Sequence, residues 1–141
     1  MSKLKLVIEN DYNFDVIGIV SHEKSTKMCW LINNQLGFDL RREEPNIQIT
    51  ARNSEEKVAF DQFLFLDKEN ETDIRLLKNK ILKFYWYKEL KQYDYVLIIK
   101  PALYDQKFNE IMEELRMIDG VLTCSAIDVD SLKEKDKMLL D

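Results

Sequence analysis

Short stretches of alternating polar and apolar residues recur along the chain, and this pattern is typical of β-strands with one face in solvent. Residues 15–22 and 93–100 instead carry apolar side chains at successive positions, as strands covered on both faces do. A short polar segment separates residues 57–67 from 72–81 and predicts a hairpin, although the spacing in 72–81 also fits a helix. The predicted strands are residues 3–9, 15–22, 46–53, 57–67, 72–81, 93–100 and 121–128.

The first predicted helix ends at about Leu36. Gly37 follows it, and glycine readily adopts the left-handed conformation that terminates helices. Either Ser25 or Thr26 can cap the start of this helix with its hydroxyl group.

The clearest helical spacing lies between Asp105, which can cap a helix, and Gly120, which follows its end. A third, short helix is expected near the C-terminus, because Ser131 and Glu134 have the spacing of a capping box. The apolar residues of these two helices are Phe108, Ile111, Met112, Leu115 and Ile118 in the first and Leu132, Leu139 and Leu140 in the second.

Two strand–helix–strand units, over residues 15–52 and 93–127, are separated by the predicted hairpin. This order predicts an α+β fold, a loosely ferredoxin-like sandwich in which two or three helices cover one face of a mostly antiparallel sheet. A three-layer α/β arrangement is the alternative. Three glycines and two prolines leave no room for a flexible linker, so a single domain over residues 1–141 is expected.

Composition and charge narrow the class of protein. With 45% hydrophobic and 33% charged residues the chain is an ordinary globular one, and its net charge of −5 argues against a dedicated nucleic-acid-binding protein. The N-terminus lacks the apolar segment of a signal peptide, and the apolar runs are far shorter than the roughly 20 residues that span a bilayer. Cys29 and Cys124 form no CxxC pair, so we expect reduced thiols, a cytoplasmic location and no membrane partner.

The segment SHEKSTKMCW, residues 21–30, contains the only histidine and one of the two cysteines. Cys29 lies on the apolar stripe of its predicted helix, which favours a buried packing role, and Cys124 is likewise expected in the core. Two alternatives concern His22: it caps the end of the preceding strand, or it assists a Cys29 thiolate in catalysis.

Trp30 falls on the opposite side of the same predicted helix, among polar residues. We expect another element to cover this large side chain. If Trp30 is exposed instead, it becomes a candidate binding anchor, because tryptophan is frequent among the residues that dominate interfaces.

The segment KFYWYKELK, residues 83–91, places four successive aromatic residues among lysines. Lysine can hold phosphates while aromatic rings stack on bases, so this segment is a candidate surface for single-stranded nucleic acid or for a protein partner. The plainer interpretation is a strand with one aromatic face in the core. The candidate binding residues of the chain are His22, Trp30, Lys83, Tyr85, Trp86, Tyr87 and Lys88.

No metal or cofactor is expected. Zinc sites use about four ligands, and one histidine with two buried cysteines cannot supply them. Residues 128–139 begin like a calcium loop but lack its central glycine and its final glutamate. The chain contains no phosphate-binding loop and no nucleophile-elbow motif.

The segment NFDVIGIVSHEK, residues 13–24, leads into CWLIN, residues 29–33, and an aromatic hairpin follows. With YKELKQYDY, residues 87–95, these segments resemble the IPExxxVDY family of small bacterial proteins. The residues that match the family signature are Glu89, Asp94 and Tyr95, while Tyr87, Lys88 and Tyr93 replace its Ile, Pro and Val.

This resemblance implies a single cytoplasmic domain and carries no assigned activity, cofactor or catalytic residue. We expect structural roles for the two acidic residues of the signature. Asp94 is placed to accept backbone N–H groups at the entry to its strand, and Glu89 is placed to pair with a lysine.

The surplus of aromatic residues, without a catalytic constellation, predicts a non-enzymatic interaction or adaptor protein. Its partner is expected to be another protein or a second copy of the chain. An RNA-associated protein that uses residues 83–91 is the alternative, and an enzyme that uses His22 and Cys29 is the third hypothesis.

Overall fold

The computed structural model describes residues 13–44, 47–50 and 57–138 of the chain. Three predictions fall outside these described residues: the strand over residues 3–9, both ends of the strand over 46–53, and the positions of Leu139 and Leu140.

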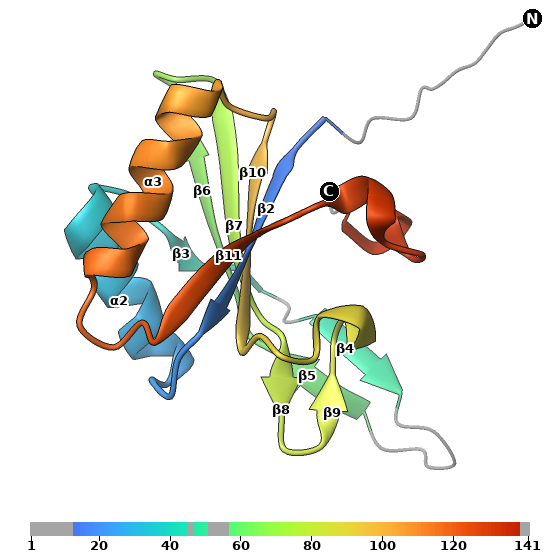
Figure 1. Ribbon diagram of the computed structural model, residues 1–141. Coiled ribbons are helices and arrows are strands. Elements are labelled where there is room, and N and C mark those ends of the chain that lie inside the picture. Colours follow the sequence, from blue (N-terminus) through green and yellow to red (C-terminus); the bar gives the residue numbers. More distant parts are fainter. Residues whose placement is uncertain (1–12, 45–46, 51–56, 139–141) are drawn as a thin grey trace, which may run out of the picture.

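Six strands form one antiparallel sheet in the order β11-β2-β10-β7-β6-β3 (Figure 1). The predicted hairpin is confirmed as β6 and β7, and the helical alternative for residues 72–81 is wrong. The strands of the sheet are β2 (Asp15–Val20), β3 (Arg41–Arg42), β6 (Gln62–Asp67), β7 (Thr72–Lys78), β10 (Tyr95–Lys100) and β11 (Thr123–Ile127).

Two α-helices, α2 (Ser25–Leu36) and α3 (Asp105–Met117), cover the same face of the sheet (Figure 1). β2 and β7 run parallel with β10 between them, and β10 and β11 run parallel with β2 between them. These are two interlocked β-α-β units, as in a ferredoxin-like sandwich. The predicted α+β class is therefore confirmed, and the three-layer α/β alternative is wrong.

Short elements pack against the opposite face of the sheet, which gives the molecule a second core. In β10, Leu97 faces the helices and Val96 faces the short elements, so burial on both faces is confirmed for this strand. The short elements of this layer are the strand β5 (Lys57–Phe60), the hairpin β8 (Lys80–Ile81) and β9 (Phe84–Tyr85), and the 3-10 turns η1 (Lys88–Leu90), η2 (Val129–Ser131) and η3 (Lys135–Met138). A further strand, β4 (Ile47–Thr50), pairs with β5.

Gly18 lies at the centre of β2, where the Tyr93 ring packs directly on the backbone. A Cβ atom at position 18 would lie 2.5 Å from Cγ of Tyr93, closer than two carbon atoms can approach. A residue without a side chain is therefore required here. The Tyr93 ring then covers the second core, beside Val16 and Val96.

The ends of α2 are only partly as predicted. Gly37 adopts φ = +73° and donates its N–H to the Asn33 carbonyl, so the predicted helix stop is confirmed. The predicted hydroxyl cap is wrong, because Lys24 is the capping residue and makes no side-chain cap bond. Ser25 instead donates its hydroxyl to the Asp61 carboxylate, which belongs to a distant part of the sequence.

The later part of the chain departs from two further predictions. Tyr104, and not Asp105, precedes the first turn of α3, and no side chain caps this end. The capping box near the C-terminus is also wrong, because the Ser131 hydroxyl donates to the Asp128 carbonyl and the Glu134 N–H donates to Glu89. Short 3-10 turns form in place of a C-terminal helix.

Candidate functional site

The structure does not bring the candidate catalytic pair together. Cys29 is buried and its Sγ lies 3.4 Å from the Leu40 carbonyl oxygen, to which the thiol donates. Burial raises the pKa of the Cys29 thiol, and the nearby Arg42 charge offsets only part of this effect. His22, by contrast, is exposed. The predicted core role of Cys29 is confirmed, and Cys124 is buried as well.

The two acidic residues of the signature bind backbone N–H groups. Asp94 accepts the Ser21 N–H at 2.9 Å, which confirms its predicted role at the entry to β10. Glu89 accepts the Lys133 N–H at 2.7 Å, so the predicted pairing with a lysine side chain is wrong. Both side chains therefore tie separate segments of the fold together.

Trp30 is 59% exposed on the outer surface of α2, so the expectation that another element covers it is wrong. The helix turns Met28, Cys29 and Ile32 towards the sheet, and Trp30 consequently points away from it. The position leaves Trp30 accessible to a partner.

Two of the candidate binding aromatics are core residues. Trp86 is 3% exposed and Tyr87 is fully buried, so neither can act as an exposed anchor. Asn79 holds this segment inward, because its backbone carbonyl accepts the Trp86 N–H and its side chain accepts the Tyr87 N–H. Burial, with a smaller contribution from Glu89, raises the pKa of Tyr87 to about 12.

The other candidates of the aromatic segment lie at the surface or close to it. Lys83 and Lys88 are exposed, and Tyr85 is half-buried. Lys83 belongs to the loop of the β8–β9 hairpin, whereas Lys88 begins the turn η1. The segment is therefore a folded hairpin followed by a turn, and two of its four aromatic residues, Trp86 and Tyr87, are buried.

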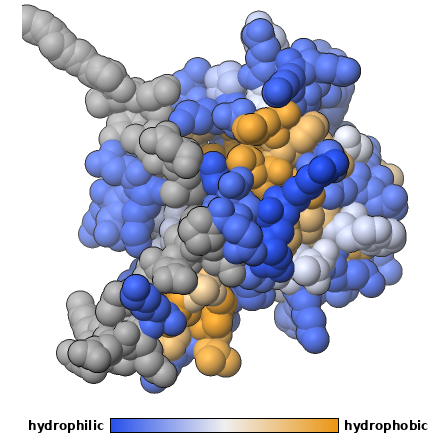
Figure 2. Space-filling view, turned by 180° about the vertical axis from the view of Figure 1, so that it is seen from behind, coloured by the Kyte–Doolittle hydropathy of each residue, from blue (hydrophilic) through white to orange (hydrophobic). Residues whose placement is uncertain are grey.

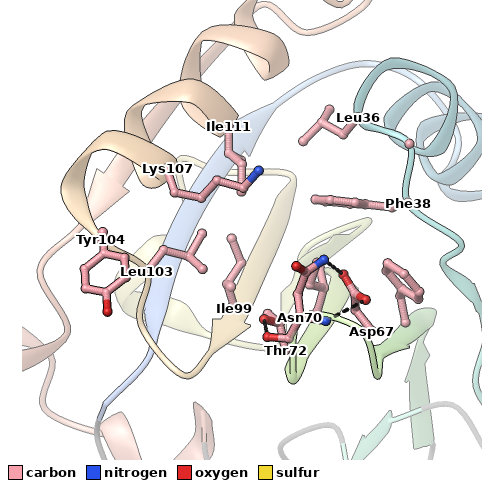
Figure 3. A pocket seen from close by; sticks show the side chains of 13 residues that line it. Leu36, Phe38, Asp67, Asn70, Thr72, Ile99, Leu103, Tyr104, Lys107 and Ile111 are labelled. Atoms are coloured by element: carbon pink, nitrogen blue, oxygen red, sulfur yellow. Dashed lines mark hydrogen bonds between the residues drawn. The ribbon is translucent and has the colours of Figure 1, made fainter.

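An apolar groove lies on the helical side of the molecule, between α2, α3 and the ends of three strands. Its main part is a hollow of about 430 Å³ (Figure 3). The rings of Phe38 and Phe65, with centroids 5.9 Å apart, form one wall. The other apolar side chains that line it are Leu36, Ile74, Ile99, Leu103 and Ile111.

A second hollow of about 310 Å³ adjoins the first along α3. The two hollows share Leu36, Phe38, Lys107 and Ile111 as lining residues, and we call the pair the interhelical groove. Hydrophobic side chains are gathered in the upper right part of Figure 2, on the side where α2 and β6 lie.

No family model matches this sequence, and no curated protein and no solved structure matches it either.

Charged and polar groups are arranged around the rim of the interhelical groove. Figure 3 shows the Lys107 amino group directed towards the hollow. On the β6–β7 turn, Asp67 accepts the Asn70 side-chain amide at 2.7 Å. Glu110 and Glu114 line the second hollow, where Glu114 accepts the Gln35 amide at 2.8 Å. Three carboxylates and one ammonium group make the rim acidic.

The geometry of the described residues offers no metal centre, since no three of their His, Cys, Asp or Glu side chains are grouped to hold an ion. None of the helices in the described ranges is long and apolar enough to cross a membrane.

The sequence interpretation missed the interhelical groove. Its lining comes from residues 35–38, 65–74 and 99–114, three segments that become neighbours only in the folded chain. The one local signal is Phe38, a large apolar residue placed directly after the glycine that ends α2.

Proposed function

We propose that the protein is a non-enzymatic interaction protein that binds a short apolar and basic segment of a protein partner in the interhelical groove. The observation that carries this proposal is the groove itself, an open hollow of about 430 Å³ in which apolar side chains such as Phe38, Phe65 and Ile111 lie beside polar ones. Apolar surface that stays open in a folded domain is a common mark of an interaction site.

The shape of the groove favours a chain segment over a small molecule. Small-molecule sites enclose most of the surface of their ligand. Here the main hollow continues along α3 into the second one, past Lys107 and Ile111, and both remain open to solvent. An elongated channel that offers both apolar and charged side chains suits alternate apolar and basic side chains of a bound peptide.

The charges on the rim favour basic residues in the partner. Asp67, Glu110 and Glu114 outnumber Lys107, so Lys or Arg side chains beside the apolar residues of the segment would meet opposite charge. The Lys107 ammonium can donate to a backbone carbonyl of the same segment, which would fix its direction.

Catalysis by His22 and Cys29 has little support, because the thiol is buried and engaged by Leu40 while the imidazole lies at the surface. The RNA hypothesis loses two stacking surfaces through the burial of Trp86 and Tyr87. Binding of a partner in the groove requires neither a reactive cysteine nor exposed rings at Trp86 and Tyr87.

We also propose a cytoplasmic location and membership of the IPExxxVDY family. The location is supported by two free, buried cysteines, which suit a reducing compartment. Membership is supported by the segments over residues 13–24, 29–33 and 87–95. Membership of this family implies no particular activity.

Calorimetry with synthetic peptides tests the groove. A peptide of alternating Lys and Leu should bind the wild-type protein, and a peptide of alternating Glu and Leu should not. Reversing one rim charge in Glu110→Lys should weaken the Lys-Leu peptide about fivefold, since a surface charge pair is worth about 1 kcal/mol or less.

The matched control is Glu113→Lys, which makes the same charge change on an exposed position of α3 that does not line the groove. It should leave the affinity unchanged. Equal weakening by both variants, or no binding of the Lys-Leu peptide, would contradict the proposal.

A further inference from the structure

The β8–β9 hairpin turns through a two-residue loop, Leu82 and Lys83, since Ile81 pairs with Phe84 on either side of it. Leu82 adopts φ = +54°, in the left-handed region. A hairpin loop with a positive φ at its first central position normally has glycine there, because a bulky side chain is strained in that conformation. The backbone therefore does not account for a leucine at this position.

Packing does not account for it either. Leu82 is 85% exposed, so its side chain contributes almost nothing to either core. The hairpin is anchored instead by Ile81 and Phe84, which are half-buried against the second core. A large apolar side chain is thus held in solvent at the end of a short, anchored hairpin.

Two lysines belong to the same hairpin as Leu82. Lys80 and Lys83 are both exposed, and their Nζ atoms lie 6.0 Å and 5.8 Å from the ring centroids of Tyr85 and Phe84. Within the described ranges neither lysine forms an ion pair. The hairpin lies at the lower end of Figure 1, and hydrophobic side chains are visible at the lower end of Figure 2.

We infer that this hairpin tip, residues 80–85, docks on the surface of an anionic phospholipid bilayer. Leu82 inserts at the boundary between headgroups and acyl chains, while Lys80 and Lys83 contact the lipid phosphates. Lysine suits this position, because its apolar stem can lie along the membrane while its ammonium group reaches the headgroups. Only the tip enters the bilayer, so no spanning helix is needed.

This inference departs from the expectation that the chain has no membrane partner. That expectation rested on the lack of a long apolar run, whereas an interfacial contact needs only one or two inserted side chains. It is independent of the interhelical groove, which shares no lining residue with the hairpin tip.

The exposed chemistry of the tip favours a bilayer over nucleic acid. Bases bind to exposed ring faces, but Trp86 and Tyr87 are buried, Phe84 and Tyr85 are half-buried, and the most exposed apolar side chain of the tip, Leu82, has no ring. An aliphatic side chain between lysines gains most from an apolar layer beneath a negatively charged surface.

Co-sedimentation of the full chain with vesicles tests the inference. The wild-type protein should sediment with vesicles of phosphatidylcholine and phosphatidylglycerol in equal parts, and not with phosphatidylcholine alone. Leu82→Gly should weaken binding about tenfold, because burial of its side-chain carbons is lost. This variant keeps the fold, since glycine suits the backbone at position 82. The double variant Lys80→Glu, Lys83→Glu should abolish binding.

Two controls match these changes. Leu122→Ala truncates an exposed leucine elsewhere, and Lys24→Glu with Lys27→Glu reverses two exposed lysines around the start of α2. Both should bind vesicles as the wild type does. The inference is overturned if the wild type ignores anionic vesicles or if Leu82→Gly binds them undiminished. It is also overturned if a single-stranded oligonucleotide binds through Lys80 and Lys83 and the anionic vesicles do not.

Discussion

Among the described residues other than glycine, only Leu82 and Glu71 have a positive φ, at +54° and +53°. Each ends or forms a tight turn, where glycine would adopt the same backbone without steric cost. Leu82 is therefore strained at the hairpin tip, although glycine would fit this backbone without strain.

A first prediction follows for stability. Leu82→Gly should raise the free energy of unfolding by about 1 kcal/mol, because a left-handed conformation costs about 1–2 kcal/mol and glycine loses somewhat more entropy on folding. Urea denaturation measures the free energy of unfolding, which Glu71→Gly should also raise. A clear loss of stability in Leu82→Gly would show that this leucine supports the hairpin.

Asp61 provides a prediction for pH. Burial raises the pKa of this carboxyl, but the Ser25 hydroxyl, the Arg42 guanidinium at 2.9 Å and nearby positive charge together lower the pKa below its ordinary value of 3.8. The ionised form thus stabilises the folded state. Its contribution is complete above pH ~4 and is lost as the pH falls through the lowered pKa.

Asp61→Asn should accordingly unfold about 1–2 kcal/mol more easily than the wild type at neutral pH. The difference should shrink on acidification below pH ~4, as urea denaturation over a pH series will show. Asp15, whose pKa is raised by burial, titrates in both proteins and cancels in the comparison. A difference that stays constant with pH would contradict this account.

At the scale of elements, the fit of Tyr93 on Gly18 links β2 to the segment that precedes β10. Gly18→Ala should cost about 1–3 kcal/mol, because the new Cβ atom would meet the ring at 2.5 Å. Replacing the ring as well, in Gly18→Ala with Tyr93→Ala, should cost less than the sum of the two single changes. If the losses of stability in the two single variants add up in the double variant, the contact between the new Cβ atom and the Tyr93 ring is not the cause of the loss.

Local signals in the sequence predict most of the elements. Successive apolar residues marked β10, and Gly37 marked the end of α2. The predicted helix cap is wrong at the start of α2, where a residue distant in the sequence binds the hydroxyl group predicted to cap the helix. The Ser25 hydroxyl donates its hydrogen bond to Asp61, which is 36 positions away, and not to the backbone of its own helix. No local pattern contains that information.

In the aromatic segment, residues 83–91, burial likewise depends on contacts that the local sequence pattern does not contain. Strict alternation would place Trp86 and Tyr87 on opposite sides, but both follow the last strand pair of the hairpin and turn inward. The C-terminal turns contribute to this burial, since Lys137 Nζ donates to the Trp86 carbonyl at 2.9 Å. The interhelical groove likewise depends on contacts between distant segments, and only the structure reveals it.

At the scale of the whole molecule, the two proposed surfaces lie on different sides of the sheet. The interhelical groove lies on the helical side, and the hairpin tip belongs to the layer that packs on the opposite face. Occupation of one surface therefore leaves the other accessible. An interaction protein of this kind could hold a peptide segment while its tip rests on a bilayer.

The most direct test of the central claim is to locate the bound Lys-Leu peptide by NMR chemical-shift mapping on the 141-residue chain. We predict that the largest shifts fall on the groove, at Gly37, Phe38, Lys107 and Ile111, and that Glu110→Lys reduces them at equal peptide concentration. Shifts centred elsewhere, for example around Trp30, or shifts unchanged by Glu110→Lys, would contradict the claim that the interhelical groove is the binding site.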